Sequence, residues 1–275
     1  MDELRRLYVE EQLTLSAIGA REGCSMTTVW RRLKAAGIAC REGGLGPRYA
    51  RSDFSGDVCE RAYLVGFRIG DLHVAREGSR TIVVKCTSTR DEQIELFRSL
   101  FGSYGHVYTD EATIARRQRQ TIGMEVRLNL TFDFLLAKQD AVPDWVLEQD
   151  DTFFAFLAGY LDAEGYICTY LPRGYRAPQV RIEVRSYDAH LLRQLAAGLA
   201  KRGIACPPVR SRTTAGYVNR AGVRSNREMW GLAVCRQDSL LVLFTSIDPY
   251  LRHDRRRRDM LRAWEIVTKA TNKYF

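Results

Sequence analysis

Two short segments of the sequence each place an acidic residue directly after a pair of small residues. Asp71 follows such a pair in YLVGFRIGDLHV, and Glu164 follows one in FLAGYLDAEGYI. In each pair the two small residues are one helical turn apart on an apolar segment. The repetition predicts two equivalent helices, each ending on a carboxylate. The small residues are Gly66 and Gly70 in the first segment, and Gly159 and Ala163 in the second.

Small residues at this spacing let two helix backbones approach closely, so we expect the two helices to pack on each other. Asp71 and Glu164 would then meet at one end of the pair, near a pseudo-twofold axis. That end is the carboxyl end of both helices, where the macrodipole disfavours negative charge. A divalent metal would offset both charges. Mg²⁺ binds one or two carboxylates and completes its shell with water and phosphate oxygens, as in phosphodiester cleavage.

Each acidic motif is followed by the same order of predicted elements. A strand, a turn and an amphipathic helix are predicted over TIVVKCTSTRDEQIELFRSLFGSYG and again over VRIEVRSYDAHLLRQLAAGLAKRG, with Asp91 and Asp188 before the helices. A further strand, MEVRLNLTF or MWGLAVCR, closes each unit. We therefore predict a duplicated α+β protein with repeats at residues 58–145 and 146–275, joined through AVPDWVLEQDD.

Two of these strands alternate apolar and polar residues, which gives one face to the core and one to a ligand. In QVRIEVRS the apolar set is Val180, Ile182 and Val184. Arginine pairs with guanine and asparagine with adenine in the major groove. The alternative is an ordinary solvated sheet face. The polar residues predicted to contact bases are Arg181, Glu183, Arg185, Glu125, Arg127 and Asn129.

The net charge is +9, from 42 Lys and Arg against 33 Asp and Glu. A preference for Arg over Lys also arises from a GC-rich genome, but it does not explain the clustering. Residues 206–227 hold five arginines and no acid: Arg210, Arg212, Arg220, Arg224 and Arg227. Arg255 to Arg258 form a second cluster. Such segments suit a surface that follows phosphates.

Residues 1–40 predict a separate helical domain. LSAIGAREGCSMTTVWRRLKAAGI is consistent with helix, tight turn and helix, with Ser25 as a cap and Gly19 where the helices touch. It resembles a helix-turn-helix of the resolvase or sigma-factor type. The residues then expected to face DNA are Thr27, Thr28, Arg31 and Arg32. The alternative is a helical hairpin that only docks onto the rest.

Residues 41–57 are predicted to be a linker, because REGGLGPRYAR is rich in glycine.

Composition excludes several classes of protein. Hydrophobic residues make up 45% and charged residues 27%, as in ordinary folded proteins. No apolar run is long enough for a membrane span, and the charged start predicts no signal peptide, so we expect a cytoplasmic, nucleoid-associated protein. The seven cysteines are scattered without zinc-site spacing, and they are expected to be reduced and structural.

The motif LAGYLDAEG, residues 157–165, closely resembles the signature of the LAGLIDADG homing endonucleases. The segment LVGFRIGDL, residues 64–72, resembles it more loosely, and departs from the pattern at Arg68, Ile69 and Leu72. The likeness covers about residues 58–265, in the single-chain form with two repeats.

The resemblance implies two αββαββα units whose strands form a saddle in the major groove. It implies a monomeric, site-specific double-strand DNA endonuclease with a long asymmetric target. Asp71 and Glu164 would be the catalytic metal ligands for Mg²⁺, with Mn²⁺ able to substitute and Ca²⁺ binding without cleavage. A basic residue near the scissile phosphates is also implied, and the candidates are Lys85, Arg127, Arg185 and Arg236.

Two other functions fit the same fold. One is a DNA-binding transcription regulator that has lost cleavage; retention of both acids favours the enzyme. The other is an intron RNA maturase, which a basic surface apart from the saddle would mark. An intein is disfavoured, because the chain lacks Cys or Ser at its start and His-Asn at its end. The histidines are expected on the surface or in packing, although His73 could border the acids.

Overall fold

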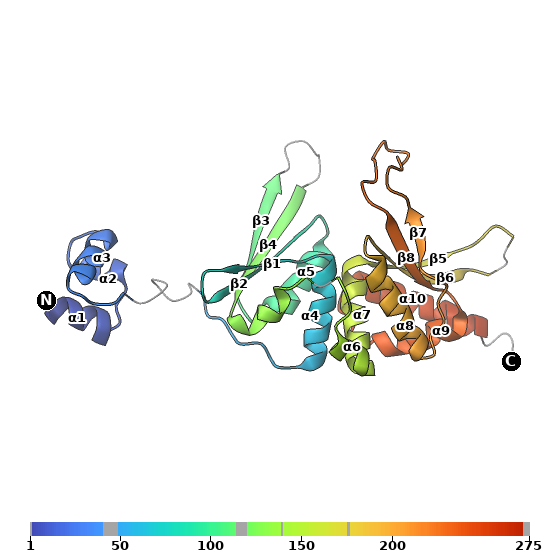
Figure 1. The fold of residues 1–275 in the computed structure, drawn as a ribbon, viewed down its shortest axis with the longest axis horizontal. Helices are drawn as coiled ribbons and strands as arrows, with labels where there is room; N and C mark the ends of the chain where they lie inside the picture. Colours follow the sequence, from blue (N-terminus) through green and yellow to red (C-terminus); the bar gives the residue numbers. More distant parts are fainter. Residues whose placement is uncertain (1, 41–48, 114–119, 139, 175–176, 272–275) are drawn as a thin grey trace. The chain divides into compact units, whose positions relative to one another are not determined.

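The computed structural model describes residues 2–40, 49–113, 120–138, 140–174 and 177–271. The chain forms two compact units, residues 1–50 and residues 51–275. Each unit has its own cluster of buried apolar side chains. The two units are therefore described separately (Figure 1).

The N-terminal unit contains α1 (Asp2–Arg5), the π-helical turn η1 (Arg6–Glu10), α2 (Leu15–Arg21) and α3 (Met26–Ala35). Its core contains Leu7, Ile18, Val29 and Leu33, all fully buried. The sequence pattern indicates α2 and α3 but not α1 and η1. The latter turn supplies Leu7 and Tyr8 to this core.

The turn between α2 and α3 has the expected local chemistry. The Ser25 hydroxyl accepts the amide of Thr28 at 3.2 Å, which caps α3. Gly23 has a φ of +66°, a left-handed conformation that glycine adopts without strain. At Gly19 an added Cβ would lie 2.6 Å from the carbonyl oxygen of Cys24. Glycine is thus required where α2 meets the turn that leads into α3.

Part of the predicted linker of residues 41–57 belongs to the second unit. Residues 41–48 lie outside the described part of the chain, whereas residues 51–57 belong to the second unit. Phe54 packs among Tyr104, Phe132 and Phe134, with ring centroids 5.1 to 6.1 Å away. This single apolar side chain in a polar segment explains why the stretch is held against the fold.

The second unit contains two repeats of the same order of elements. The first has α4 (Val58–Gly70), β1 (His73–Glu77), β2 (Thr81–Ser88), α5 (Asp91–Phe101), β3 (Val107–Thr113), β4 (Gln120–Leu128) and the 3-10 helix η2 (Leu130–Leu135). The short helix α6 (Asp144–Glu148) leads to the second repeat. That repeat has α7 (Asp150–Glu164), β5 (Gly165–Tyr170), β6 (Gln179–Ser186), α8 (Ala189–Lys201), β7 (Arg210–Thr213), β8 (Met229–Val234), α9 (Gln237–Ile247) and α10 (Asp254–Thr271).

Each repeat builds a four-stranded antiparallel sheet. The strand orders are β1-β2-β4-β3 and β5-β6-β8-β7, which are equivalent. Asp188 caps α8 by accepting the amides of His190 and Leu191, whereas Asp91 is the first residue of α5. The α+β class is confirmed, and the element order agrees with the predicted duplication.

The two motif helices, α4 and α7, lie side by side at the centre of this unit (Figure 1). An added Cβ on Gly66 would lie 2.1 Å from the carbonyl oxygen of Phe156, and one on Gly159 would lie 2.1 Å from that of Tyr63. The two contacts are equivalent under exchange of the repeats. The backbones therefore touch as the small residues predict, and no side chain fits between them.

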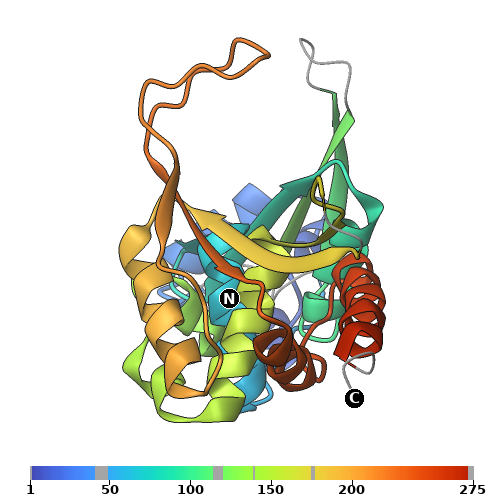
Figure 2. The same ribbon diagram turned by 90° about the vertical axis from the view of Figure 1, so that its right-hand side faces the viewer.

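The sheets lie above the helices, and two long hairpins rise from them (Figures 1 and 2). One is formed by β3 and β4 and the other by β7 and β8. The inward residues of β4 and β6, among them Val126, Leu128, Val180 and Ile182, are buried in the common core. The opposite faces lie on the side of the hairpins (Figure 2).

Replacing Gly159 by alanine tests the helix contact. In an ordinary helix this change stabilises by about 1 kcal/mol, but here we expect a loss of about 3 kcal/mol in the free energy of unfolding, because the methyl overlaps a backbone carbonyl. Gly123→Ala in β4 is the control, since a Cβ there meets nothing within 4 Å. Urea denaturation of both variants checks this; equal stabilities would contradict it.

Candidate metal and nucleic-acid site

The structure brings the two motif acids to the same end of the helix pair. Asp71 follows the last residue of α4 and donates its amide to the Phe67 carbonyl at 3.2 Å. Glu164 is the last residue of α7. An added Cβ on Gly70 would lie 2.4 Å from Ala163 Cβ and 2.9 Å from Glu164 Cγ. The helix ends are thus in contact, and the two carboxylates are neighbours.

Both carboxyls are less acidic than ordinary ones. The surrounding protein atoms, followed by the negative charge of Glu164, raise the pKa of Asp71 to about 6. Desolvation also raises the pKa of Glu164. Each residue is nevertheless exposed to solvent on one side. The arrangement concentrates negative charge at an accessible point between the repeats, which is the electrostatic condition for binding a cation.

Three other side chains act on this charge. Gln93, buried on α5, donates Nε2 to Asp71 Oδ2 at 2.9 Å. Arg256 on α10 donates to the carbonyls of Leu161 and Ala163, at 2.5 and 3.0 Å, and lowers the pKa of both acids. Lys138 also lowers the pKa of both. The sequence pattern does not indicate Gln93 or Lys138, and it includes Arg256 only within a basic run.

The two acids form a small set of possible metal ligands. Within the described ranges, no group of three or more His, Cys, Asp or Glu side chains could hold a metal. A cation held by Asp71 and Glu164 would therefore complete its shell with other ligands, such as water. Mg²⁺ is bound in this way in phosphate chemistry. The donor set and the raised pKa values of the two carboxyls fit a hard divalent cation.

The departures of the first motif have structural explanations. Arg68 is buried, and its guanidinium donates to the carbonyls of Leu135 and Leu72, so it faces η2 rather than the acids. In the second motif Asp162, at the position of Ile69, is buried and accepts the Tyr63 hydroxyl at 2.6 Å. Each motif helix therefore buries a charged residue, an arginine in the first repeat and an aspartate in the second.

Asp162 also holds the segment that leads into α10. Its Oδ2 atom accepts the backbone amides of Arg252 and His253 at 2.8 and 3.0 Å. Burial lowers the pKa of His253 to about 4, so it is a neutral packing residue. These contacts place Arg256, on the first turn of α10, beside the acids.

The first two candidate basic residues lie on the sheet of the first repeat. Lys85 lies opposite His73 in the sheet register and pairs with Glu125 at 2.8 Å. Arg127 pairs with Glu125 at 3.0 Å and with Glu77 at 3.4 Å. His73 is exposed at the start of β1, next to Lys85. Because His73 lies only two residues after Asp71, Lys85 is the basic candidate whose position in the sheet is nearest to Asp71.

The other two candidates lie in the second repeat. Arg185 pairs with Glu183 at 3.0 Å on β6. Arg236 precedes α9 and pairs with Asp238 at 2.6 Å, beyond the end of β8. Gly165, next to Glu164, pairs with Val184 of β6, and Arg185 is the next residue along that strand. Val234, at the end of β8, pairs with Ile182 of β6, and Arg236 lies two residues beyond it. Arg236 is thus farther along the sheet from the acids than Arg185.

Two of the residues predicted to contact bases, Asn129 and Glu183, are held against other parts of the protein. Asn129 lies just past β4 and donates its side-chain amide to Asp53 at 3.0 Å, which fastens the entry segment. Glu183 points outward but its side chain is completely covered, so it has no surface to offer a base. The prediction for Glu183 therefore needs correction, because alternation along a strand fixes a direction but not what lies above it, whereas the contact of Asn129 with DNA stays a prediction.

The remaining predicted contacts do lie on the outward faces. Arg127 and Arg185 are exposed, and Arg181 is partly exposed. Glu125 is partly covered by its ion pairs with Lys85 and Arg127. The two outward faces thus carry charged side chains, most of them arranged in pairs.

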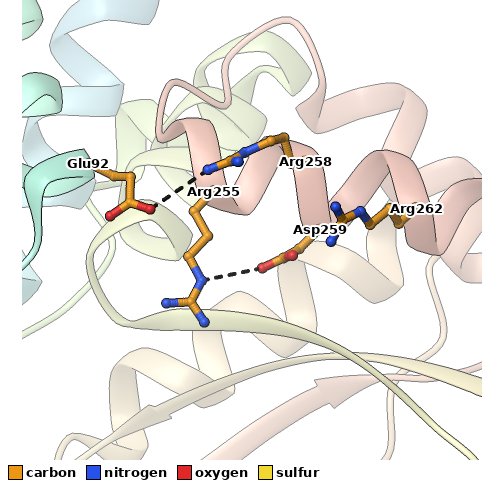
Figure 3. Close-up of a pocket in the computed structure, with 5 residues that line it drawn as sticks. All are labelled: Glu92, Arg255, Arg258, Asp259 and Arg262. Carbon is orange, nitrogen blue, oxygen red and sulfur yellow. Dashed lines mark ion pairs between the residues drawn. The ribbon is translucent and has the colours of Figure 1, made fainter.

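The cluster Arg255 to Arg258 is not one continuous basic surface. Arg256 points to α7, and Arg257 pairs with Asp248 at 3.4 Å. The helical turn separates four consecutive arginines onto different faces. Arg255 and Arg258 face a hollow of about 290 Å³ between α5 and α10, also lined by Arg262 (Figure 3). There they pair with Asp259 and Glu92 at 3.8 and 3.7 Å.

The arginines of residues 206–227 extend from β7 into the loop before β8. Arg212 pairs with Glu183, and Arg227 lies over the Tyr187 ring at 5.3 Å. A bridge between Val218 and Arg224 continues the hairpin beyond the sheet. Arg210 and Arg220 are exposed. This segment therefore presents basic residues along the hairpin, as predicted.

In the N-terminal unit, Thr27 and Arg31 are exposed on α3. Arg32 is also exposed and pairs with Glu22 at 3.5 Å. Thr28 is half-buried, and its hydroxyl is 2.9 Å from that of Ser25. The Thr28 hydroxyl therefore contributes to the cap of α3, and its contact with DNA stays a prediction.

The seven cysteines are all free thiols. Side-chain packing rather than covalent cross-links therefore joins the elements of each unit.

In the described part of the chain, no helix combines the length and the hydrophobicity that a membrane span requires.

The pKa of Asp71 provides a test of the carboxylate pair. Removing the neighbouring charge by Glu164→Gln should lower the pKa of Asp71, and Arg256→Gln should raise it. A carbon-detected NMR titration of the Asp71 carboxyl measures both. No change in Glu164→Gln would mean that the acids are apart.

The raised pKa also predicts a stability trend. Asp71 has a folded pKa of about 6 against 3.8 for the free side chain, so the folded state holds this proton more tightly. Its contribution to stability is therefore fully present below pH 3.8 and is lost as the pH rises through 6. Asp71→Asn should remove this part of the pH dependence in thermal unfolding. An unchanged profile in the variant would assign the trend to other groups.

Solved structures match the fold of this chain. A point mutant of I-SmaMI is 11% identical over 82% of this chain and 93% of that protein, with a TM-score of 0.51. The homing endonuclease I-WcaI, bound to its DNA recognition sequence, is 14% identical over 78% and 95%, with a TM-score of 0.48. Full-length DUF199/WhiA from Thermatoga maritima is 15% identical over 80% and 63%, with a TM-score of 0.46.

No protein-family model and no curated protein matches the sequence. At the identities of the solved structures, the similarity concerns the fold alone. The chain is a mixed α+β protein with two equivalent four-stranded antiparallel sheets, and its architecture is similar to that of the I-SmaMI point mutant.

Proposed function

We propose that this protein is a site-specific double-strand DNA endonuclease of the LAGLIDADG type. The observation that carries the proposal is the meeting of Asp71 and Glu164 at the end of two helices that touch backbone to backbone. Both acids keep a raised pKa there, which a bound dication would relieve. Placing two such groups together costs free energy, and metal binding is a function that offsets the cost.

The proposed roles follow from position. Asp71 and Glu164 bind Mg²⁺, with Mn²⁺ as a substitute and Ca²⁺ supporting binding alone. A divalent cation at this point supplies positive charge to the scissile phosphate and to the attacking water. Gln93 orients the Asp71 carboxyl through its 2.9 Å hydrogen bond. Lys85, the basic candidate nearest to Asp71 in register, is placed to act on a phosphate in the first half of the site.

The partner is a long, asymmetric DNA duplex, and the protein is nucleoid-associated for that reason. The outward strand faces and the two hairpins lie on the same side of the unit (Figure 2), where a duplex would be received. The chain carries both repeats, so one copy can contact both halves of a target as a monomer. Its two halves differ in sequence at the outward positions, which favours an asymmetric site.

One observation favours a second function, a non-cleaving DNA-binding regulator. Arg256 lies beside the acids and already offsets part of their charge. A maturase-like role in RNA binding has less support, since the basic residues of α10 are divided among several faces. The proposed function is therefore tested by cleavage itself.

A selection from a random duplex library distinguishes these functions. Sites bound in Ca²⁺ are recovered, Mg²⁺ is then added, and the ends are sequenced. Discrete double-strand breaks inside an enriched site are expected for the endonuclease. Enrichment without breaks would contradict it and favour the regulator.

Neutral substitution of either acid should separate binding from cleavage. Asp71→Asn and Glu164→Gln are each expected to abolish Mg²⁺-dependent cleavage of the selected site, while the dissociation constant for DNA changes by less than about tenfold. Glu95→Gln, which alters an exposed carboxylate paired with Arg98 on α5, is the matched control. Unchanged cleavage in both acid variants would remove these residues from the mechanism.

The N-terminal unit is proposed to lengthen the recognised site. Removal of residues 1–50, which form a unit with its own core, should weaken binding at least about tenfold and leave cleavage intact at saturating protein. Arg31→Ala in the full chain should also weaken binding, but by less than removal of the whole unit. A folded but catalytically dead truncated protein, tested at saturation, would argue against this division of labour.

A further inference from the structure

The second sheet buries a carboxylate on its outward face. Ile182 and Val184 on β6 face the core, so Glu183 between them points to the opposite side. The Glu183 side chain is nevertheless 0% exposed. Three arginines approach it, Arg181 at 3.3 Å, Arg185 at 3.0 Å and Arg212 at 2.9 Å. The arginines, rather than the core, therefore bury this carboxylate.

Each of the three arginines comes closest to Glu183 through the same atom, Nε. This atom is the innermost nitrogen of the guanidinium, so the two terminal amino groups lie farther along each side chain. Two tyrosine rings fix the guanidinium planes further. Arg181 lies 5.4 Å from the centre of the Tyr170 ring, and Arg185 lies 5.3 Å from that of Tyr166.

Glu183 is charged in this setting. Burial acts to raise its pKa, but hydrogen bonds from Tyr166 and Arg185 and the charges of Arg185 and Arg212 outweigh it, so the pKa of Glu183 is lowered. The Tyr166 hydroxyl donates to Glu183 and accepts from Arg185. The negative charge of Glu183 thus holds the cluster together.

Arg212 reaches Glu183 from a different strand, and the backbone is adapted to this path. Arg212 lies on β7 where the register with β8 shifts, between Ser211 and Thr213. Such irregularities re-aim a side chain. The Arg212 side chain then passes over Gly231 of β8, where an added Cβ would lie 2.5 Å from Arg212 Nε. A glycine in the strand thus leaves room for the arginine.

We propose that Glu183 is a positioning residue that holds Arg181, Arg185 and Arg212 as a fixed set of donors for guanine edges in one half of the DNA site. This rests on the proposed DNA-binding function. Arginine recognises guanine O6 and N7 with two parallel donors, so the orientation of its plane decides the contact. A carboxylate that faces each Nε leaves terminal amino groups to make it, although one of those of Arg185 also donates to the Tyr166 hydroxyl at 2.9 Å.

Among the described residues of the first repeat, the position equivalent to Glu183 is occupied differently. Glu183 pairs with Tyr166 in the second sheet, and Lys85 pairs with His73 at the matching place in the first sheet. A lysine therefore occupies the position equivalent to Glu183. Glu125 on β4 pairs there with Lys85 and Arg127 instead. The selectivity for guanine that Glu183 supports therefore belongs to the half-site under the second repeat.

The test compares base preferences of the full-length protein and Glu183→Gln by selection from a random duplex library in Ca²⁺. In the variant, discrimination at guanine positions of one half-site should fall at least about tenfold. Affinity for random-sequence DNA should stay equal or rise, because a negative charge leaves a basic face. Glu95→Gln, with the same change of charge on α5, should keep the wild-type preferences.

Gly231→Ala provides a second variant that keeps all the charges. Its methyl displaces Arg212, so discrimination should fall at fewer positions of the same half-site. If the wild-type protein selects a sequence and Glu183→Gln selects it equally well, the role of Glu183 is wrong, although the proposed DNA-binding function stands. A wild type that selects no sequence would contradict the proposed function as well.

Discussion

The contact between the backbones of α4 and α7 is the constraint on which the second unit depends. Gly66 and Gly159 each meet a carbonyl oxygen of the other helix, so the spacing of the helices allows no larger residue. Each helix leads directly into the first strand of its own sheet, through Asp71 and Gly165. The helix contact therefore sets how the two sheets are placed and where the two acids meet.

The charge at the end of this pair is only partly balanced. Asp71 and Glu164 have raised pKa values although Arg256 and Lys138 both act to lower them. Arg256 also satisfies carbonyls at the end of α7, where a cation is favoured by the macrodipole. A fixed guanidinium thus stabilises the helix end, and the residual negative charge remains available to a cation from solution.

Many arginines of this basic protein serve the fold rather than its surface. Arg68 satisfies two carbonyls in the interior, and Arg202 is nearly buried against Phe153 while it pairs with Asp150 at 2.8 Å. Around Glu183, ion pairing instead gives arginines at the surface a defined direction. Net charge alone therefore indicates an anionic partner without locating the surface that binds it.

The local sequence pattern predicted the duplicated α+β architecture, the glycine contacts between the helices and the adjacent acids. It could do so because spacing along a helix fixes which residues share a face. The alternation in β4 and β6 likewise predicted which residues face the core. Pattern could not predict the partners of outward residues. Whether Glu183 meets a base or three arginines depends on Arg212 of another strand, on a register shift and on Gly231. Arg256 and Gln93 reach the acids only because α10 and α5 fold beside them, and such long-range contacts are decided by tertiary packing alone.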